Sequence, residues 1–249
     1  MKLKNLEKFE IEKNIFLIDK AIWLKKQKLL GIADLHIGYE EYLVEQGILL
    51  PKKQFKIMKE EIINLINKLK PKIVLINGDL KHEFGEISKQ EWKETNEIID
   101  IIMKKSKVIL IKGNHDTILE PIAKRKGLKI LDYYIVNNIC FMHGHKIYNE
   151  IIKNKKIKII VLAHIHPAIS LREGIKTEKY KCWLIGKWKN KKIIIMPSFI
   201  FYVEGIDISN YKFDEIFLKN IENFDIYAIG DKIYWLGKLK NIVPGWRNW

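Results

Sequence analysis

Residues 107–116 read KVILIKGNHD, and they join an apolar run to three adjacent polar side chains. The run is typical of a buried strand and ends at Gly113, after which Asn114, His115 and Asp116 follow directly. Burying such groups without partners costs several kcal/mol each. They therefore either face solvent or bind something charged, and the rest of the chain decides between these two possibilities.

Similar apolar runs recur along the chain, and each ends in polar residues. Continuous β-branched runs of this kind are typical of strands that are buried on both faces. Helical patterns separate the first three runs, one over 51–70 that opens with Pro51 and one over 88–105. Ser88 and Glu91 have the spacing of a capping box. This alternation predicts an α/β domain with partly parallel pairing, from strands at 28–36, 72–79, 107–116, 139–145 and 157–166.

After residue 180 the pattern changes to shorter strands, which predict antiparallel hairpins in a second sheet. We expect one domain over 1–249, with a motif-bearing part at about 28–170 and a second-sheet part at about 175–240. The hydrophobic content of 47% provides for a sizeable core. The expected strands are 180–188, 191–199, 224–230 and 232–239.

Composition limits the classes of protein to which the chain can belong. No stretch approaches 18 uninterrupted apolar residues, and the first twenty residues scatter charges, so we expect neither a membrane span nor a signal peptide. Cys140 and Cys182 lie in apolar contexts and are expected to be reduced core thiols of a cytoplasmic protein. The net charge of +15 is compatible with a nucleic-acid partner, but it comes almost entirely from lysines that can equally coat solvated faces.

All seven histidines fall at or near the carboxyl ends of predicted strands, and so do Asp34, Asp79 and Asp116. In open α/β sheets these ends converge on one crevice. Residues i and i+2 of a strand share a face, so Asp34/His36 and His164/His166 should each present two side chains together. The histidines are His36, His82, His115, His143, His145, His164 and His166.

This convergence predicts a metal centre. Imidazole, carboxylate and an amide carbonyl form a mixed nitrogen and oxygen set, which favours Mn, Fe, Zn or Ni over a thiolate-held structural zinc or an all-oxygen magnesium or calcium site. The candidate ligands outnumber what one ion can use, so we expect two divalent ions bridged by one carboxylate.

The ordered motifs DLH, GD, GNHD, HGH and AHIH over 34–166 resemble those of the calcineurin-like metallophosphoesterase superfamily. Ala163 departs from the usual glycine of the last motif. The resemblance implies a four-layer α/β/β/α sandwich of two mixed sheets flanked by helices. The segments at 78–85, 197–199 and 204–208 are closer to a short subgroup of phosphoesterases related to SbcD, some of which are associated with DNA ligases and helicases.

The resemblance also implies roles for individual residues. Asp34, His36, Asp79 and His166 would hold one ion, and Asp79, Asn114, His143 and His164 the other, with Asp79 bridging. His115 would protonate the leaving oxygen while Asp116 holds its ring, and His82 and His145 would contact substrate. Two other interpretations stay open: Asp116 as a helix N-cap, and His145 as a structural residue.

The implied reaction is metal-dependent phosphodiester hydrolysis, expected of a Mn-dependent nuclease acting on DNA or RNA. A two-metal-activated hydroxide would be the nucleophile and His115 the general acid. The alternatives are a small-molecule nucleotide phosphodiesterase or phosphomonoesterase, and a non-catalytic scaffold of the same fold. Nucleic acid is the expected partner, a helicase or ligase a further one, and no membrane is expected.

Overall fold

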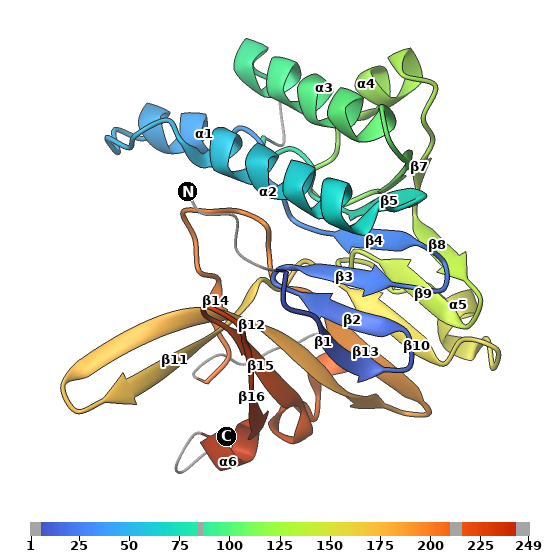
Figure 1. The fold of residues 1–249 in the computed structure, drawn as a ribbon, viewed down its shortest axis with the longest axis vertical. Coiled ribbons are helices and arrows are strands. Elements are labelled where there is room, and N and C mark those ends of the chain that lie inside the picture. Colours follow the sequence, from blue (N-terminus) through green and yellow to red (C-terminus); the bar gives the residue numbers. More distant parts are fainter. Residues whose placement is uncertain (1–5, 84–86, 210–215, 243–249) are drawn as a thin grey trace.

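The computed structural model describes residues 6–83, 87–209 and 216–242. Part of the segment at 78–85 and the aromatic tail at 243–249 lie outside these ranges. Within them, two β-sheets pack face to face and helices cover their outer sides (Figure 1). This arrangement is the four-layer α/β/β/α sandwich that the motifs imply.

The first sheet has seven strands, in chain order across the sheet. Neighbouring strands pair antiparallel from β1 to β4 and parallel from β4 to β7. The strands are β1 (Phe9–Glu12), β2 (Ile15–Ile18), β3 (Ala21–Leu24), β4 (Leu29–Ile32), β5 (Ile73–Asn77), β6 (Lys107–Ile111) and β7 (Ile130–Leu131).

Helices α2 (Gln54–Leu69) and α3 (Lys89–Met103) cover the outer face of this sheet, and the shorter α1 (Tyr39–Glu45) and α4 (Glu120–Arg125) flank them (Figure 1). Apolar side chains of α2 and α3, such as Ile62 and Ile98, pack against Val74 and Leu110 of the sheet. Burial of this face stabilises both helices, since it removes apolar surface from water.

The start of α2 differs from the sequence expectation. The helix begins at Gln54 and not at Pro51, because a carboxylate oxygen of Glu40, on α1, accepts a hydrogen bond from the Gln54 amide at 3.2 Å. A carboxylate at this position satisfies one of the free N–H groups of the first turn. The helix start is therefore set by a tertiary contact that the local sequence does not show.

The predicted cap of α3 is confirmed in part. The Ser88 hydroxyl accepts from the Glu91 amide at 3.0 Å, as a capping box requires. The Glu91 carboxylate does not complete the box; its Oε1 accepts from the amides of His82 at 2.7 Å and Glu83 at 3.1 Å. Glu91 is fully buried and anchors the loop that carries His82.

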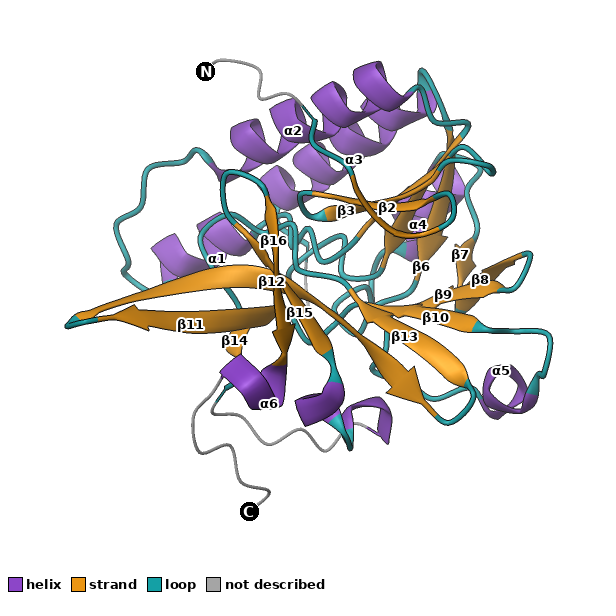
Figure 2. Ribbon diagram, turned by 60° about the horizontal axis from the view of Figure 1, so that its bottom comes forward, coloured by secondary structure: helices purple, strands orange, loops and turns teal. Residues whose placement is uncertain are grey.

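The second sheet is mixed, with β15 and β16 joined to the side of β12 (Figure 2). The hairpins β12–β13 and β15–β16 are antiparallel, as predicted, whereas β10 pairs parallel with both β9 and β13. The strands are β8 (Tyr133–Val136), β9 (Ile139–Met142), β10 (Ile159–Leu162), β11 (Pro167–Glu173), β12 (Lys176–Trp188), β13 (Lys191–Ile195), β14 (Ile206–Asp207), β15 (Asp225–Ile229) and β16 (Ile233–Lys238).

Short helices close the outer side of the second sheet. They are α5 (Asn149–Lys153), α6 (Leu239–Ile242) and the 3₁₀ turns at Ile216–Leu218 and Ile221–Asn223. Phe217 and Leu239 from these helices pack against Leu184 and Ile193 of the sheet. Cys140 and Cys182 are free thiols buried in the same layer, as expected.

A cluster of apolar side chains fills the space between the two sheets. It contains Leu29 and Leu75 of the first sheet and Phe141 and Trp183 of the second. This cluster fixes how the sheets lie against each other, and hence how their loops meet. Across the described part of the chain, no helix is both long and apolar enough to cross a membrane.

Candidate metal centre

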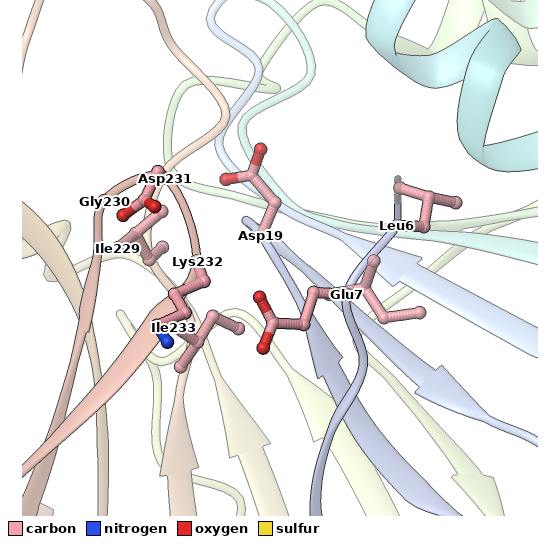
Figure 3. A pocket seen from close by; sticks show the side chains of 9 residues that line it. Leu6, Glu7, Asp19, Ile229, Gly230, Asp231, Lys232 and Ile233 are labelled. Carbon is pink, nitrogen blue, oxygen red and sulfur yellow. The ribbon is translucent and has the colours of Figure 1, made fainter. Parts of the chain in front are cut away.

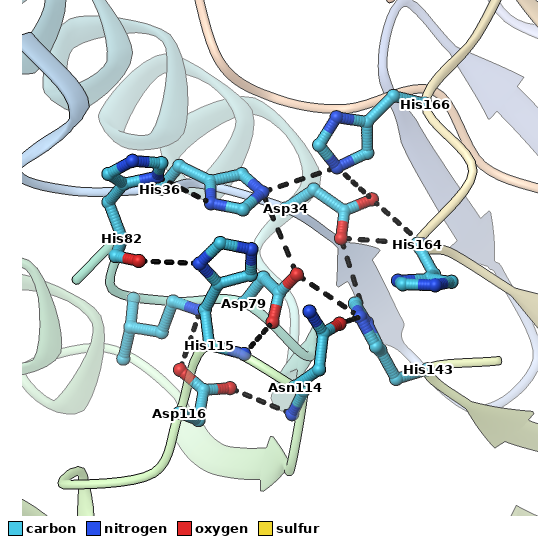
Figure 4. A network of polar contacts seen from close by, with 12 residues as sticks. Asp34, His36, Asp79, His82, Asn114, His115, Asp116, His143, His164 and His166 are labelled. Carbon is cyan, nitrogen blue, oxygen red and sulfur yellow. Dashed lines mark hydrogen bonds and ion pairs between the residues drawn. The ribbon is translucent and has the colours of Figure 1, made fainter. Parts of the chain in front are cut away.

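The predicted ligands meet at the edge where the strands of both sheets end (Figure 4). The loops after β4, β5 and β6 supply four of them from the first sheet, and the loops after β9 and β10 supply three from the second. The first four are Asp34, His36, Asp79 and Asn114, and the other three are His143, His164 and His166.

One group consists of Asp34, His36, Asp79 and His166, each of which offers a ligand atom within 4.8 Å of the others. The Nε2 atoms of His36 and His166 are 3.2 Å apart. His166 Nε2 lies 3.5 Å from Asp34 Oδ2, and His36 Nε2 lies 3.7 Å from Asp79 Oδ2.

A second group consists of Asp79, His143 and His164. His143 Nε2 lies 3.2 Å from Asp79 Oδ2 and 3.0 Å from Asn114 Oδ1, which brings the amide oxygen into the same group. Asp79 belongs to both groups. The two groups therefore coincide with the two ligand sets that the motifs imply, and their shared residue is the one implied to bridge.

The backbone brings these side chains together in a different way from the one predicted. Strands β4 and β10 end at Ile32 and Leu162, so Asp34, His36, His164 and His166 lie beyond them, and strand alternation does not align their side chains. All four, and Asp79 as well, have positive φ angles between 44° and 71°. Non-glycine residues seldom adopt this conformation, which costs of the order of 1 kcal/mol each and clusters at functional sites.

His115 and Asp116 point in different directions. The His115 ring lies beside the centre, 4.7 Å from the His36 ring between centroids, and its Nδ1 contacts the backbone carbonyl of His82. Because a carbonyl only accepts, Nδ1 carries the proton in this contact. The His82 carbonyl thus orients the ring, which is the role implied for Asp116.

Asp116 instead turns into the protein, where it is 1% exposed. Its carboxylate accepts hydrogen bonds from the amides of Gly113 at 2.9 Å, Leu80 at 3.0 Å and Lys81 at 3.4 Å. It is not a helix N-cap either, since α4 begins at Glu120 with Leu119 before it. Asp116 ties the loop after β6 to the loop after β5, and so holds Asn114 and Asp79 next to each other.

The structure also places the two residues implied to contact substrate. His82 Nδ1 lies 3.3 Å from His36 Nδ1, and the His82 ring stacks on His115 with 5.2 Å between centroids. His36, His82 and His115 thereby form a third group of converging nitrogens, which the motifs do not imply. The His145 ring lies 5.2 Å from that of His143, on the side of the second group.

The charge balance of the centre suits a cation. Burial, with the nearby His166, lowers the pKa of His36 well below its ordinary value. Burial also disfavours the charged form of His143, but the Asp79 carboxylate outweighs it and raises the pKa to about 9. Neutral imidazole is the ligand form, and several lone pairs here converge on the same small volume. The residues present therefore fit a divalent ion in each group.

A family model described as calcineurin-like phosphoesterase matches residues 27–226, most of the chain and all of this centre. The chain belongs to the calcineurin-like phosphoesterase family. It is therefore a phosphoesterase, a hydrolase, and family and residue groups together support divalent metal binding. No curated protein matches the sequence.

Solved structures align with this chain at low sequence identity, and one of them supports the same fold. The nuclease MPE of Pseudomonas putida aligns with a TM-score of 0.68 and 18% identity, over 93% of this chain and 100% of that one. Yfce, a phosphoesterase from E. coli, aligns with a TM-score of 0.42 and 15% identity, over 84% and 97%. A zinc complex of Vps29 from Entamoeba histolytica aligns with a TM-score of 0.37 and 12% identity, over 83% of this chain and 96% of that one.

A small cavity of about 60 Å³ lies away from this phosphoesterase centre, between the N-terminal segment and the turn that joins β15 to β16 (Figure 3). Glu7, Asp19 and Asp231 contribute carboxylates to it, and Lys232 an ammonium. None of the converging histidines lines this cavity, so it does not share the chemistry of the centre.

Proposed function

We propose that the chain is a Mn-dependent phosphodiesterase that cleaves nucleic acid. The observation that carries this proposal is the pair of ligand groups that share Asp79, with the His115 ring beside them. Asp34, His36, Asp79 and His166 would hold one ion, and Asp79, Asn114, His143 and His164 the other. When bound, such ions neutralise the charge of a phosphate and lower the pKa of water.

His115 has the chemistry of a general acid. The His82 carbonyl holds its Nδ1 proton and leaves Nε2 to the centre, so a protonated ring can deliver a proton from Nε2 to the leaving oxygen of the ester. The two carboxylates, Asp34 and Asp79, are buried and lie within 3.7 Å of histidine nitrogens. They are therefore fixed in place before any substrate arrives.

Two observations favour a nucleic-acid substrate over a small nucleotide. The net charge of +15 favours binding to a polyanion, and one solved relative of this fold is a nuclease. The resemblance of residues 78–85 to the SbcD-related subgroup points the same way. A phosphomonoesterase acting on nucleotides is the second candidate, supported by the family match alone.

Metal-stripped protein, assayed with added Mn²⁺ and with chelator, tests the reaction. We expect turnover of bis-p-nitrophenyl phosphate and of single-stranded or hairpin DNA with Mn²⁺, and none with chelator. Asp79→Asn should abolish it, while Asp231→Asn, the same change at the exposed β15–β16 turn, should not. Turnover of p-nitrophenyl phosphate alone would favour the phosphomonoesterase, and no turnover of any substrate would favour the scaffold.

Binding to DNA is tested separately from cleavage. The affinity of Asp79→Asn for a DNA hairpin should fall steeply as salt is raised from about 50 to 200 mM if the lysines contact phosphates. An affinity that does not change with salt would contradict the polyanionic substrate and leave the phosphoesterase assignment intact.

A further inference from the structure

Each candidate ion would need ligands from both sheets. In the second group, Asp79 and Asn114 follow strands of the first sheet, whereas His143 and His164 follow strands of the second. A change in the separation of the sheets at this edge would pull the group apart. Apolar packing between the sheets is not directional, so a polar contact is needed to fix this separation.

Asn77, the last residue of β5, makes such a contact. Its side chain is fully buried between the sheets, and its Nδ2 donates to the carbonyl of Met142 at 3.2 Å and to that of Val161 at 3.4 Å. Met142 ends β9 directly before His143, and Val161 lies in β10 three residues before His164. One amide group of the first sheet thus holds both ligand-bearing strands of the second.

The backbone of the same residue orients one of the ligands. The Asn77 carbonyl accepts a hydrogen bond from His143 Nδ1 at 2.9 Å, which fixes the orientation of the ring and directs His143 Nε2 at Asp79 and Asn114. The next residue, Gly78, has no room for a side chain, because a Cβ there would lie 2.2 Å from His143 Nδ1. Asn77 therefore binds the His143 ring through its carbonyl, and Gly78 leaves the space that the ring occupies.

We propose that Asn77 is a positioning residue for the second ion: it sets the distance between the ligands of the first sheet and His143 and His164. This inference rests on the proposed two-metal function. The first ion depends less on Asn77, since three of its four ligands, Asp34, His36 and Asp79, come from loops of the first sheet alone. A purely structural amide would stabilise the fold without favouring one ion over the other.

The test is Mn²⁺ binding to metal-stripped Asn77→Ala by calorimetry, with the electron paramagnetic resonance of the loaded protein as a second readout. Removing an outer partner of metal ligands weakens binding by about 10–100-fold. We expect wild-type affinity for one ion, weakening of this size for the other, and loss of the spin-coupled signal of a manganese pair. Asn77→Ser keeps one hydroxyl donor and should be intermediate; it carries the test if Asn77→Ala does not fold.

Ser106→Ala is the matched control. Its buried hydroxyl donates to the Pro71 carbonyl at 2.8 Å, at the opposite end of β6 from the centre, so its loss costs stability without reaching the ligands. We expect Ser106→Ala to bind both ions as the wild type does. Equal weakening of both ions in Asn77→Ala, or none, would overturn the positioning role. A wild type that binds no Mn²⁺ would instead overturn the proposed function.

Discussion

Gly113 lies against Asp79 so closely that a Cβ at residue 113 would sit 2.0 Å from Asp79 Oδ1 and 2.3 Å from the Asp79 amide nitrogen. The neighbouring His115 amide donates to the same Oδ1 at 2.9 Å. The loop after β6 therefore packs directly on the carboxylate that both ligand groups share. The glycine is required here for space and not for an unusual φ angle.

Gly113→Ala should therefore disable the centre while leaving most of the fold intact. The methyl group must displace Asp79, and a misplacement of about 1 Å at a reacting centre can cost about 100-fold in rate. We expect at least this loss in Mn²⁺-dependent hydrolysis of bis-p-nitrophenyl phosphate. Gly127→Asn is the control, because a Cβ there meets no atom within 4 Å and asparagine tolerates its left-handed conformation. Unchanged hydrolysis by Gly113→Ala would show that Asp79 does not act where the structure places it.

His115→Ala should separate chemistry from metal binding. His115 belongs to neither of the two groups that contain Asp79, so both ions should stay bound while hydrolysis falls by about 10²–10⁴-fold, as for the loss of a general acid. Ion content by elemental analysis and turnover, measured on one sample, check this. Loss of an ion from His115→Ala would make His115 a ligand through its group with His36 and His82.

Asp116→Asn should lower the free energy of unfolding of the protein. An asparagine offers one acceptor oxygen and an NH₂ group that only donates, so it cannot accept from both Gly113 and Leu80 with separate oxygens as the carboxylate does. Leaving a buried donor unsatisfied costs about 1–3 kcal/mol, which urea unfolding of the metal-free protein would measure. Full stability with reduced turnover would instead support the ring-holding role implied by the motifs.

Sequence reasoning predicted which residues converge but not how they do so. Polar residues at strand ends were enough to predict that Asp34, Asp79 and His164 lie together, but not that β9 and β10, which precede His143 and His164, belong to the second sheet. The left-handed conformations that aim them depend on loops which close against one another, as when the Asp34 amide donates to the Gly78 carbonyl at 3.1 Å. Such pairings join residues far apart in the chain and leave no local pattern.

Asn77 shows a second limit of prediction from sequence. Its acceptors, Met142 and Val161, are 65 and 84 residues away, so the run IVLIN shows a polar last residue but not the groups to which it bonds. Glu91 is a partial case: the capping-box spacing identified the residue, but its carboxylate serves the loop at 82–83. A buried polar residue at the end of an apolar strand is the signal that could have found Asn77.

Metal should stabilise the protein measurably. The two groups hold buried imidazoles and carboxylates that an ion would bring into contact with a positive charge. An ion that binds only the folded state stabilises it by about 2.7 kcal/mol when its free concentration is 100 times its dissociation constant. We expect Mn²⁺ to raise the midpoint of thermal unfolding and chelator to reverse this. Asp79→Asn should remove most of the shift, because Asp79 belongs to both groups. A full shift in Asp79→Asn would indicate that Mn²⁺ binds elsewhere.

Glu94 gives the fold a pH dependence that is separate from the centre. Burial on α3 raises the pKa of its carboxyl to about 7 from 4.5. The Gln90 hydrogen bond opposes the shift, and the nearby carboxylates of Glu40, Glu41 and Glu97 add to it. The folded state therefore holds a proton that the unfolded chain has already released. This contribution to stability is fully present below pH 4.5 and is lost as the pH rises through about 7.

Glu94→Gln should remove the loss of stability that the Glu94 carboxyl causes as the pH rises through about 7. The variant is neutral at every pH, so we expect it to unfold at higher urea concentration than the wild type at pH 8, with a smaller difference at pH 5. Glu61→Gln, on α2, is the control; Glu61 pairs with Lys20 at 2.6 Å, and its replacement should give no gain at pH 8. Comparing variants at each pH cancels the titration of the histidines, which is common to all of them. Equal urea midpoints of unfolding for Glu94→Gln and the wild type at pH 8 would show that ionising the Glu94 carboxyl does not destabilise the folded protein.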